Sequence, residues 1–338
     1  MRNKRPTIRD VARLAGVSHQ TVSRVINKYE NINLETRQKV ENAIEELGYY
    51  PSEIARSMSY GETRTLACIS PNLTDYTFAS LIEGAEIYAR EHGYFMISAS
   101  APDAETFRKL VEQLVQSRRT EGLLVINPYA DNRFSYLPSD VPVVLMGARP
   151  RDKGMASVAL NDEQGGYLAT KHLISIGHQH IAVISGPLEE DCTQDRVNGY
   201  LRAMQEAHLP IDPALMVSGD WSATSGQSGV EHLLKNGTHF TAIFAQNDRM
   251  ATGAIHFLQN IGWQIPKDVS IVGFDDMPLA SYFNPPLTTI QQDILALGSG
   301  AARLLLQLKE NPNSPIEQLL FSPELVIRNS TSRFHNRR

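Results

Sequence analysis

Residues 7–27 read TIRDVARLAGVSHQTVSRVIN, and this stretch predicts two short helices joined by a tight turn. Thr7 can cap the first helix, and Asp10 follows it at the spacing of a capping box. Gly16 tolerates the left-handed backbone that ends a helix, and Ser18 can cap the second helix. The pattern is typical of a helix-turn-helix.

Each predicted helix has an apolar face and a polar face. Apolar side chains at helical spacing form a seam along both helices: Ile8, Val11, Ala12, Ala15, Val22, Val25 and Ile26. The other face of the second helix carries side chains that can hydrogen-bond to base edges and phosphates: His19, Gln20, Ser23, Arg24 and Asn27. A buried seam and a polar recognition face together suit the DNA major groove. The spacing alone would also fit an ordinary pair of amphipathic helices whose polar faces are exposed to solvent.

Positive charge is concentrated in the same segment. Residues 1–29 hold seven lysines and arginines against one acid, Asp10, which gives a net charge of +6. The whole chain carries a net charge of −5. This asymmetry indicates an anionic partner for the N-terminal end alone.

The composition limits the class of protein. A chain of 338 residues, 42% hydrophobic and 20% charged, is long enough for two or three soluble globular domains. We expect a cytoplasmic protein without membrane contact, because no apolar run is long enough for a membrane span or a signal peptide. Cys68 and Cys192 lie far apart, and the histidines form no ligand cluster, so we expect no metal and no cofactor.

Two further segments follow the helix pair. A third helix over Asn33–Leu47, stopped by Gly48, completes a predicted DNA-binding domain of residues 1–50. Residues 51–62 can form a short helix with Ile54, Ala55 and Met58 on one side. Because so short a helix is marginal alone in water, it forms only when something packs on it. An ordinary linker is the alternative.

From Thr65 onward, apolar strands alternate with amphipathic helices. The expected strands are 66–69, 94–97, 122–126, 143–146, 158–160, 181–184, 216–217, 242–245 and 270–274. The expected helices are 78–92, 105–118, 165–176, 196–207, 224–235 and 250–262. Two successive series of this kind predict two doubly wound α/β subdomains with parallel sheets. Ligands bind beyond the carboxyl ends of such strands, here the cleft between the subdomains.

Polar and aromatic residues gather at these strand ends. They are Asp75, Tyr76, Phe78, Gly147, Arg149, Arg196, Trp221, Asn247 and Asp275. Arginine, asparagine and aspartate together can hold adjacent hydroxyl groups, and aromatic rings offer flat apolar faces, a mixture that suits a sugar. Asp248 and Asp276 also follow strands, and a helix cap or a surface charge is an equal alternative for both.

Several blocks of the chain resemble the lactose repressor (LacI/GalR) family of bacterial transcription regulators over almost the full length. The blocks are DVARLAGVSHQTVSRVIN, GYYPSEIARSM, GHQHIA (177–182), GDWS (219–222), QND (246–248), VGFDD (272–276) and PLTTI (286–290). Residues 219–226 and 285–293 are similar to the lactose repressor itself. The resemblance implies a periplasmic-binding-protein-like core over 63–333 and a tail at 334–338. Its subdomains would comprise about 63–163 with 293–321 and about 164–292 with 322–333.

The resemblance also implies DNA-binding roles. His19, Gln20 and Arg24 would read bases, and Ser18, Thr21, Ser23, Asn27 and Asn31 would mainly hold phosphates. Thr7 is a further expected DNA-binding residue. Residues 52–59 resemble the family's hinge helix, which folds on DNA and inserts an apolar side chain into the minor groove. The inserted residue is usually leucine, and Met58 stands there in this chain, next to Ile54 and Ala55.

In the core, the resemblance implies an effector site. Arg196, Asn247 and Asp275 match hydroxyl-binding residues, and Trp221 matches an aromatic wall. The implied set is Asp75, Tyr76, Phe78, Gly147, Arg196, Trp221, Asn247, Asp275 and Gln292. The nucleobase-binding branch usually has phenylalanine at the position of Trp221, which favours a sugar here. Gly147 replaces an aspartate of some relatives, and Ile294 replaces an aromatic residue, so the sugar is expected to differ from the lactose repressor's.

These features predict an allosteric repressor. A homodimer would grip double-stranded operator DNA, and a sugar in the cleft would release it, with corepression as the alternative. A dimer is expected because the chain stops at Arg338 without a leucine-heptad tail. Two rival classes are a sugar-binding transport protein, disfavoured by the basic N-terminal helices, and a sugar-acting enzyme using Asp75 and Asp275. We expect no enzyme, since no nucleophile motif supports one.

Overall fold

A computed structural model describes residues 6–27, 29, 31–50, 63–127, 131–147 and 154–334. The chain forms two compact units, Met1–Arg64 and Thr65–Arg338, which are described separately below. The predicted hinge positions Ile54, Ala55 and Met58, and the strand-end residue Arg149, lie outside the described residues.

The N-terminal unit contains α1 (Ile8–Ala15), α2 (His19–Ile26) and α3 (Leu34–Leu47). The predicted caps are confirmed. The Asp10 carboxylate accepts hydrogen bonds from the Thr7 backbone N–H at 3.0 Å and its hydroxyl at 2.7 Å, and Gly16 has a φ of +67°. Ser18 Oγ accepts from the backbone N–H of Thr21 at 3.1 Å. The predicted seam is the core, where Val11, Val22 and Val40 are fully buried.

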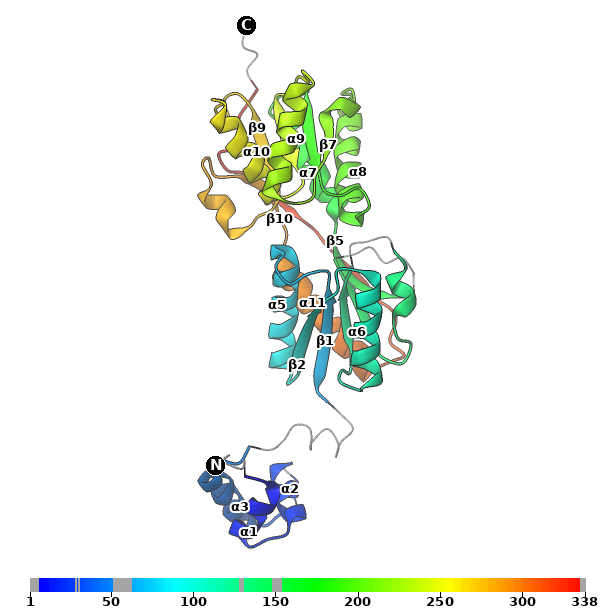
Figure 1. The fold of residues 1–338 in the computed structure, drawn as a ribbon, viewed down its shortest axis with the longest axis vertical. Helices are drawn as coiled ribbons and strands as arrows, with labels where there is room; N and C mark the ends of the chain where they lie inside the picture. Colours follow the sequence, from blue (N-terminus) through cyan, green and yellow to red (C-terminus); the bar gives the residue numbers. More distant parts are fainter. Residues whose placement is uncertain are drawn as a thin grey trace. The chain divides into compact units, whose positions relative to one another are not determined.

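The second unit contains two lobes, each built on a six-stranded sheet (Figure 1). The first lobe has the strand order β11-β5-β4-β3-β1-β2, with all of its paired strands parallel. Its elements are β1 (Thr65–Ser70), α5 (Tyr76–Glu91), β2 (Phe95–Ser100), α6 (Ala104–Gln116), β3 (Leu123–Ile126), β4 (Val143–Met146), β5 (Ala156–Leu160), α11 (Ile294–Glu310) and β11 (Gln318–Phe321).

The second lobe has the strand order β12-β10-β9-β8-β6-β7, in which only β12 runs antiparallel to its neighbour among the described pairs. Its elements are α7 (Asp162–Ser175), β6 (Ile181–Ser185), α8 (Asp191–Glu206), β7 (Met216–Ser218), α9 (Ala223–Lys235), β8 (Ala242–Ala245), α10 (Asp248–Asn260), β9 (Ser270–Asp275), β10 (Thr288–Gln291) and β12 (Glu324–Val326). The predicted doubly wound α/β class is confirmed.

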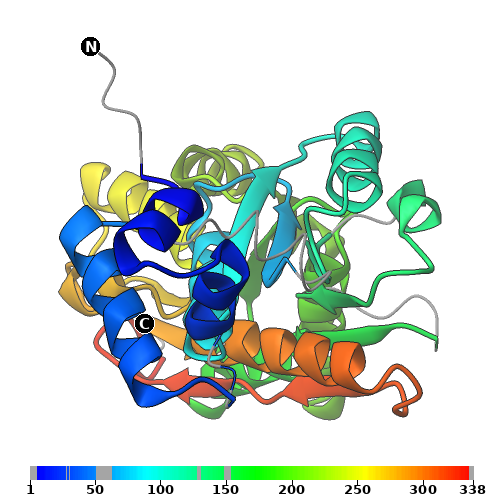
Figure 2. The same cartoon turned by 90° about the horizontal axis from the view of Figure 1, so that it is seen from below.

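Both faces of each sheet are covered because successive side chains of a strand point to opposite sides. In β1, Leu66 and Cys68 pack with α5 and α11, whereas Ala67 and Ile69 pack with Phe107 of α6. Helices α5 and α11 lie side by side, the cyan and orange helices of Figures 1 and 2. In the second lobe, α7 and α8 cover one face and α9 and α10 the other.

Several helices begin earlier than the hydrophobic pattern predicts. Helix α5 begins at Tyr76 instead of 78, α8 at Asp191 instead of 196, and α10 at Asp248 instead of 250. First helical turns carry polar and acidic residues that satisfy free backbone N–H groups, so the apolar stripe starts one turn late. Arg196 was predicted to start α8. That prediction is wrong, since Arg196 lies in the second turn of this helix. The chain crosses between lobes after β5, β10 and β11.

Candidate functional site

Helix α2 presents the predicted recognition face. His19, Gln20 and Arg24 are exposed, whereas Val22 and Val25 are buried beneath them. The other predicted contacts with described side chains are exposed or half-buried: Thr7, Ser18, Thr21, Ser23, Asn27 and Asn31. Hydroxyls at the helix starts are already used as caps, so the exposed long side chains are those best able to reach base edges.

A cavity of about 90 Å³ lies between the two lobes and has room for several water molecules. The first lobe contributes a mostly apolar lining: Asp75, Thr77, Phe78, Leu81, Ile126, Gly147, Leu160, Ile294 and Leu297. The second lobe contributes a polar lining: Asp162, Glu190, Cys192, Arg196, Trp221, Asn247, Arg249, Asp275 and Gln292. We call these two surfaces the apolar wall and the polar wall.

Eight of the nine predicted effector residues line this cavity, and Tyr76 does not. Tyr76 lines an adjacent cavity together with Ser80 and Glu83, which follow it at helical spacing on the same face of α5. Its neighbours Asp75 and Phe78 line the pocket itself. The prediction took Asp75, Tyr76 and Phe78 as facing one pocket. The turn of the helix instead directs Tyr76 to a different cavity from the other two.

Arg196 is the most firmly held group of the polar wall. Its side chain is buried, its Nε donates to Asp162 Oδ1 at 2.8 Å, and its Nη1 donates to the backbone carbonyl of Gln246. The guanidinium lies 3.6 Å from the centroid of the Phe274 ring and 5.5 Å from that of Trp221. Burial alone lowers the pKa of Arg196, but the nearby carboxylates outweigh it and the pKa is raised. Arg196 therefore stays charged.

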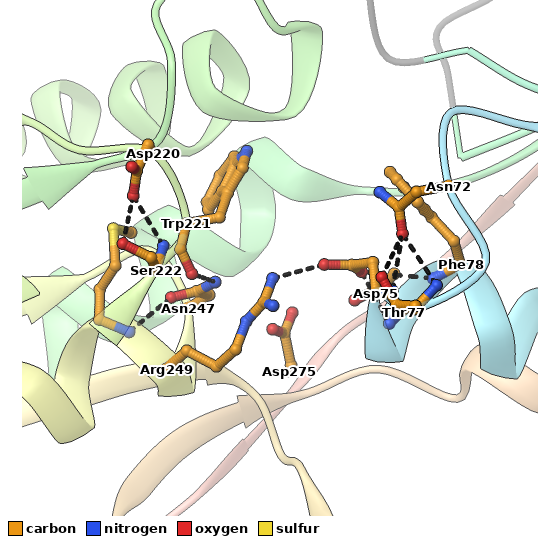
Figure 3. A network of polar contacts seen from close by, with 12 residues as sticks. Asn72, Asp75, Thr77, Phe78, Asp220, Trp221, Ser222, Asn247, Arg249 and Asp275 are labelled. Atoms are coloured by element: carbon orange, nitrogen blue, oxygen red, sulfur yellow. Dashed lines mark hydrogen bonds and ion pairs between the residues drawn. The ribbon is translucent and has the colours of Figure 1, made fainter. Parts of the chain in front are cut away.

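Trp221 is fixed from three sides, and Figure 3 shows one of these contacts, that with Asn247. Its indole Nε1 donates to Glu190 Oε2 at 2.9 Å, and its backbone carbonyl accepts from Asn247 Nδ2 at 3.0 Å. A Cβ at Gly186 would come within 2.0 Å of the indole ring, so only glycine lets the ring seat there. Trp221 has a φ of +68°, a strained value for this residue type that its neighbours hold in place.

Asp275 ends β9 with a φ of +109° and turns its carboxylate into the pocket. Its Oδ1 accepts a hydrogen bond of 2.6 Å from Gln292 Nε2. Burial, helped by the nearby carboxylates of Asp248 and Asp75, raises the pKa of Asp275 well above its usual range, although Arg196 opposes the shift. Gln292 follows β10, so two neighbouring strand ends form one polar pair.

Asp248 and Asp276 are not surface charges, and neither lines the cavity between the lobes, although Asp276 lines the adjacent cavity. Asp248 is fully buried at the start of α10 and accepts from Thr289 Oγ1 at 2.6 Å and the Met277 N–H at 2.8 Å. Its burial raises its pKa to about 7. Asp276 forms an ion pair of 2.7 Å with Arg328. Both side chains brace the strand ends behind the polar wall.

One ion pair spans the cleft (Figure 3). Arg249 of α10 donates to the carboxylate of Asp75, the residue that caps α5 in the other lobe. Asp75 is itself held, because its Oδ1 accepts from the backbone N–H of Thr77 at 3.0 Å. The pair therefore joins a rigid helix start in one lobe to a flexible side chain in the other.

The sequence reasoning missed five polar groups of this pocket: Thr77, Asp162, Glu190, Cys192 and Arg249. All follow strands of the predicted sheets, so the strand-end rule pointed to their vicinity. It could not say which polar residue of each loop turns inward. Among the described residues, no group of three histidine, cysteine, aspartate or glutamate side chains could hold a metal ion. In the same part of the chain, no helix is both long and apolar enough to cross a membrane.

Comparison with known proteins identifies the family. The model of bacterial regulatory proteins of the lacI family matches residues 7–52, and that of the periplasmic binding protein-like domain matches residues 170–331. The HTH-type transcriptional repressor PurR of Vibrio campbellii is 35% identical over 332 residues, which cover 97% of this chain and 99% of that protein.

Two solved structures extend the comparison. The lac repressor dimer bound to operator and the anti-inducer ONPF matches with a TM-score of 0.89 and 30% identity, over 97% of this chain and 100% of that one. The transcriptional regulator CelR in complex with cellobiose matches with a TM-score of 0.74 and 30% identity, over 96% and 100%. The chain belongs to the lacI family of bacterial transcriptional regulators. Its class of activity is DNA-binding repression under ligand control.

Proposed function

We propose that this regulator binds an inverted-repeat operator as a homodimer and that a small carbohydrate in the cleft releases it. The recognition helices of a dimer would enter successive major grooves, about 34–36 Å apart. His19, Gln20 and Arg24 would choose the sequence, and phosphate contacts would supply much of the affinity. Residues 51–62 would form the hinge that links effector and operator.

The observation that carries the carbohydrate assignment is the polar wall beside an indole ring. Arg196, Asn247 and Asp275 present a donor, an amide and an acceptor, which together match vicinal hydroxyl groups. Trp221 offers a flat apolar surface for the carbon face of a sugar ring. Similar proteins support this chemistry, since CelR is described with cellobiose and an Enterococcus faecium family member, 27% identical, with bound ribose.

The dimer proposal rests on an exposed sheet edge. Strand β2 is the outermost strand of the first sheet, and its Phe95 and Ile97 are 69% and 41% exposed. An edge strand with large exposed apolar side chains is a surface that a second copy can cover. The lac repressor structure described above is a dimer on its operator.

A ligand screen tests the proposal. Thermal unfolding of the full-length protein would be followed with a panel of mono- and disaccharides and with nucleobases, the ligands of another family branch. A cleft ligand present at a hundredfold excess over its Kd stabilises the folded protein by about 2.7 kcal/mol. Stabilisation by a sugar supports the proposal, and stabilisation by nucleobases alone overturns the carbohydrate assignment.

A further inference from the structure

The charged groups around the pocket do not balance. Four carboxylates and two guanidinium groups line it: Asp75, Asp162, Glu190, Asp275, Arg196 and Arg249. Arg196 pairs with Asp162 and Arg249 pairs with Asp75. Among the described residues, Glu190 and Asp275 therefore have no ion-pair partner of their own. Among the lining residues that the structure describes, carboxylates therefore outnumber guanidinium groups by two.

These two carboxylates are buried, and each is only half satisfied. Glu190 and Asp275 are both 7% exposed. Glu190 uses Oε2 for the Trp221 indole, and Asp275 uses Oδ1 for the Gln292 amide. The described residues donate no hydrogen bond to Glu190 Oε1 or Asp275 Oδ2. Neither oxygen is one of the fully buried side-chain atoms without a hydrogen-bond partner, and both side chains line the pocket, so a ligand that brings N–H or O–H groups can pair with them there.

Both cations are already committed to protein partners. Arg196 is held by a carboxylate, a backbone carbonyl and the face of Phe274. Arg249 is held by Asp75, which the start of α5 fixes in place. Burial raises the pKa of Glu190 and, further, that of Asp275, as expected of carboxylates that lack compensating charge. An anionic ligand would raise these two pKa values further, whereas an ammonium group would lower them and pair with the ionised carboxylates.

We propose that the pocket selects its ligand by charge, accepting neutral and amino-substituted sugars and rejecting sugar phosphates and uronic acids, with Glu190 as the specificity-determining residue. This inference rests on the proposed carbohydrate effector and adds its charge class.

The test compares sugars that differ only in charge. Binding to the full-length protein is measured by titration calorimetry with hexoses, their 2-amino derivatives, their uronates and their 6-phosphates, in the gluco, galacto and manno series. Within the series that binds, the neutral sugar and the amino sugar are expected to bind at least tenfold more tightly than the two anions. An anion that binds as tightly as its neutral counterpart overturns the charge rule.

A matched pair of variants assigns the effect to one residue. Glu190→Gln keeps an oxygen for the Trp221 indole and removes the charge. It is expected to raise the affinity of the anionic sugars relative to the neutral one by about tenfold and to lower that of the amino sugar. Glu189→Gln makes the same change on an exposed neighbour and should leave the ranking unchanged.

The outcomes separate the two proposals. An unchanged ranking in Glu190→Gln, measured on a wild-type protein that binds sugars, overturns the role of Glu190 and leaves the carbohydrate effector standing. If Glu190→Gln does not fold, the wild-type series alone decides the charge rule. Binding of nucleobases with no response to any sugar overturns the proposed effector and the charge rule with it.

Discussion

The two walls of the pocket differ in what they offer a ligand. The polar wall supplies both guanidinium groups and every lining carboxylate except Asp75. The apolar wall supplies Phe78, Leu81 and the ends of three parallel strands. Side chains of the polar wall are hydrogen-bonded to one another without a ligand. The apolar wall offers mainly an apolar contact surface. Under the proposed function, the second lobe would decide which ligand binds, and the first lobe would sense that it has bound.

Removing the anchor of the polar wall should have the largest effect. Arg196→Ala removes the ion pair with buried Asp162, so we expect a loss of about 3–5 kcal/mol in the free energy of unfolding, together with loss of the response to sugar. Urea unfolding and thermal shifts measure both. Arg202→Ala, on the same helix, breaks the more exposed pair with Glu163 and should cost under about 1 kcal/mol. Equal effects of the two substitutions would contradict the buried network.

Asp248, which lies behind the polar wall, should make the free energy of unfolding depend on pH. The pKa of Asp248 rises from 3.8 to about 7 on folding, so the folded protein binds more protons than the unfolded chain between these values. This group's contribution to stability therefore falls as the pH rises through that window, by a few kcal/mol in all.

The difference in stability between wild type and Asp248→Asn reports on Asp248 together with its electrostatic effect on Asp275, since the other residues are common to both proteins. Urea unfolding across the window should show the wild type losing stability relative to the variant as the pH rises. A constant difference, or one of opposite sign, would rule out a protonated Asp248 in the folded protein.

Trp221 of the polar wall and Phe78 of the apolar wall can be compared directly, and the expected effects on sugar binding are smaller. Trp221→Leu should weaken sugar binding by roughly 1–2 kcal/mol, because it removes the fixed stacking surface and leaves Glu190 without its indole donor. Phe78→Leu keeps an apolar cover and should cost roughly half as much. Titration calorimetry with the sugar found by screening gives both values. A larger loss for Phe78→Leu would reverse the roles assigned to the walls.

The ion pair between Arg249 and Asp75, which joins the two walls, should contribute least to stability. Arg249 is 39% and Asp75 17% exposed at the side chain, so solvent screens the pair and we expect a coupling of about 0.2–1 kcal/mol. A double-mutant cycle of Arg249→Met and Asp75→Asn measures it, and asparagine retains the cap of α5. Coupling of several kcal/mol would mean that the lobes are locked together without a ligand.

The sequence predicted the helix-turn-helix best, because its caps and seam are set by residues within a few positions of one another. It predicted Trp221, Asn247 and Asp275 through the rule that parallel strands end at one edge. It missed Glu190 and Arg249, since a charged side chain in a loop looks the same whether it turns inward or toward solvent. The burial of Asp248 depends on Thr289 and Met277, which lie far along the chain, and no local pattern shows that contact.

The most direct test of the account is operator binding with and without the sugar. Fluorescence anisotropy of the full-length protein would use an inverted-repeat duplex selected from a random library, at fixed salt. The account predicts that a saturating cleft-binding sugar weakens operator binding by about 5- to 150-fold in wild type and has no effect in Arg196→Ala. Operator affinity that stays the same when a sugar is shown to fill the wild-type cleft would contradict it.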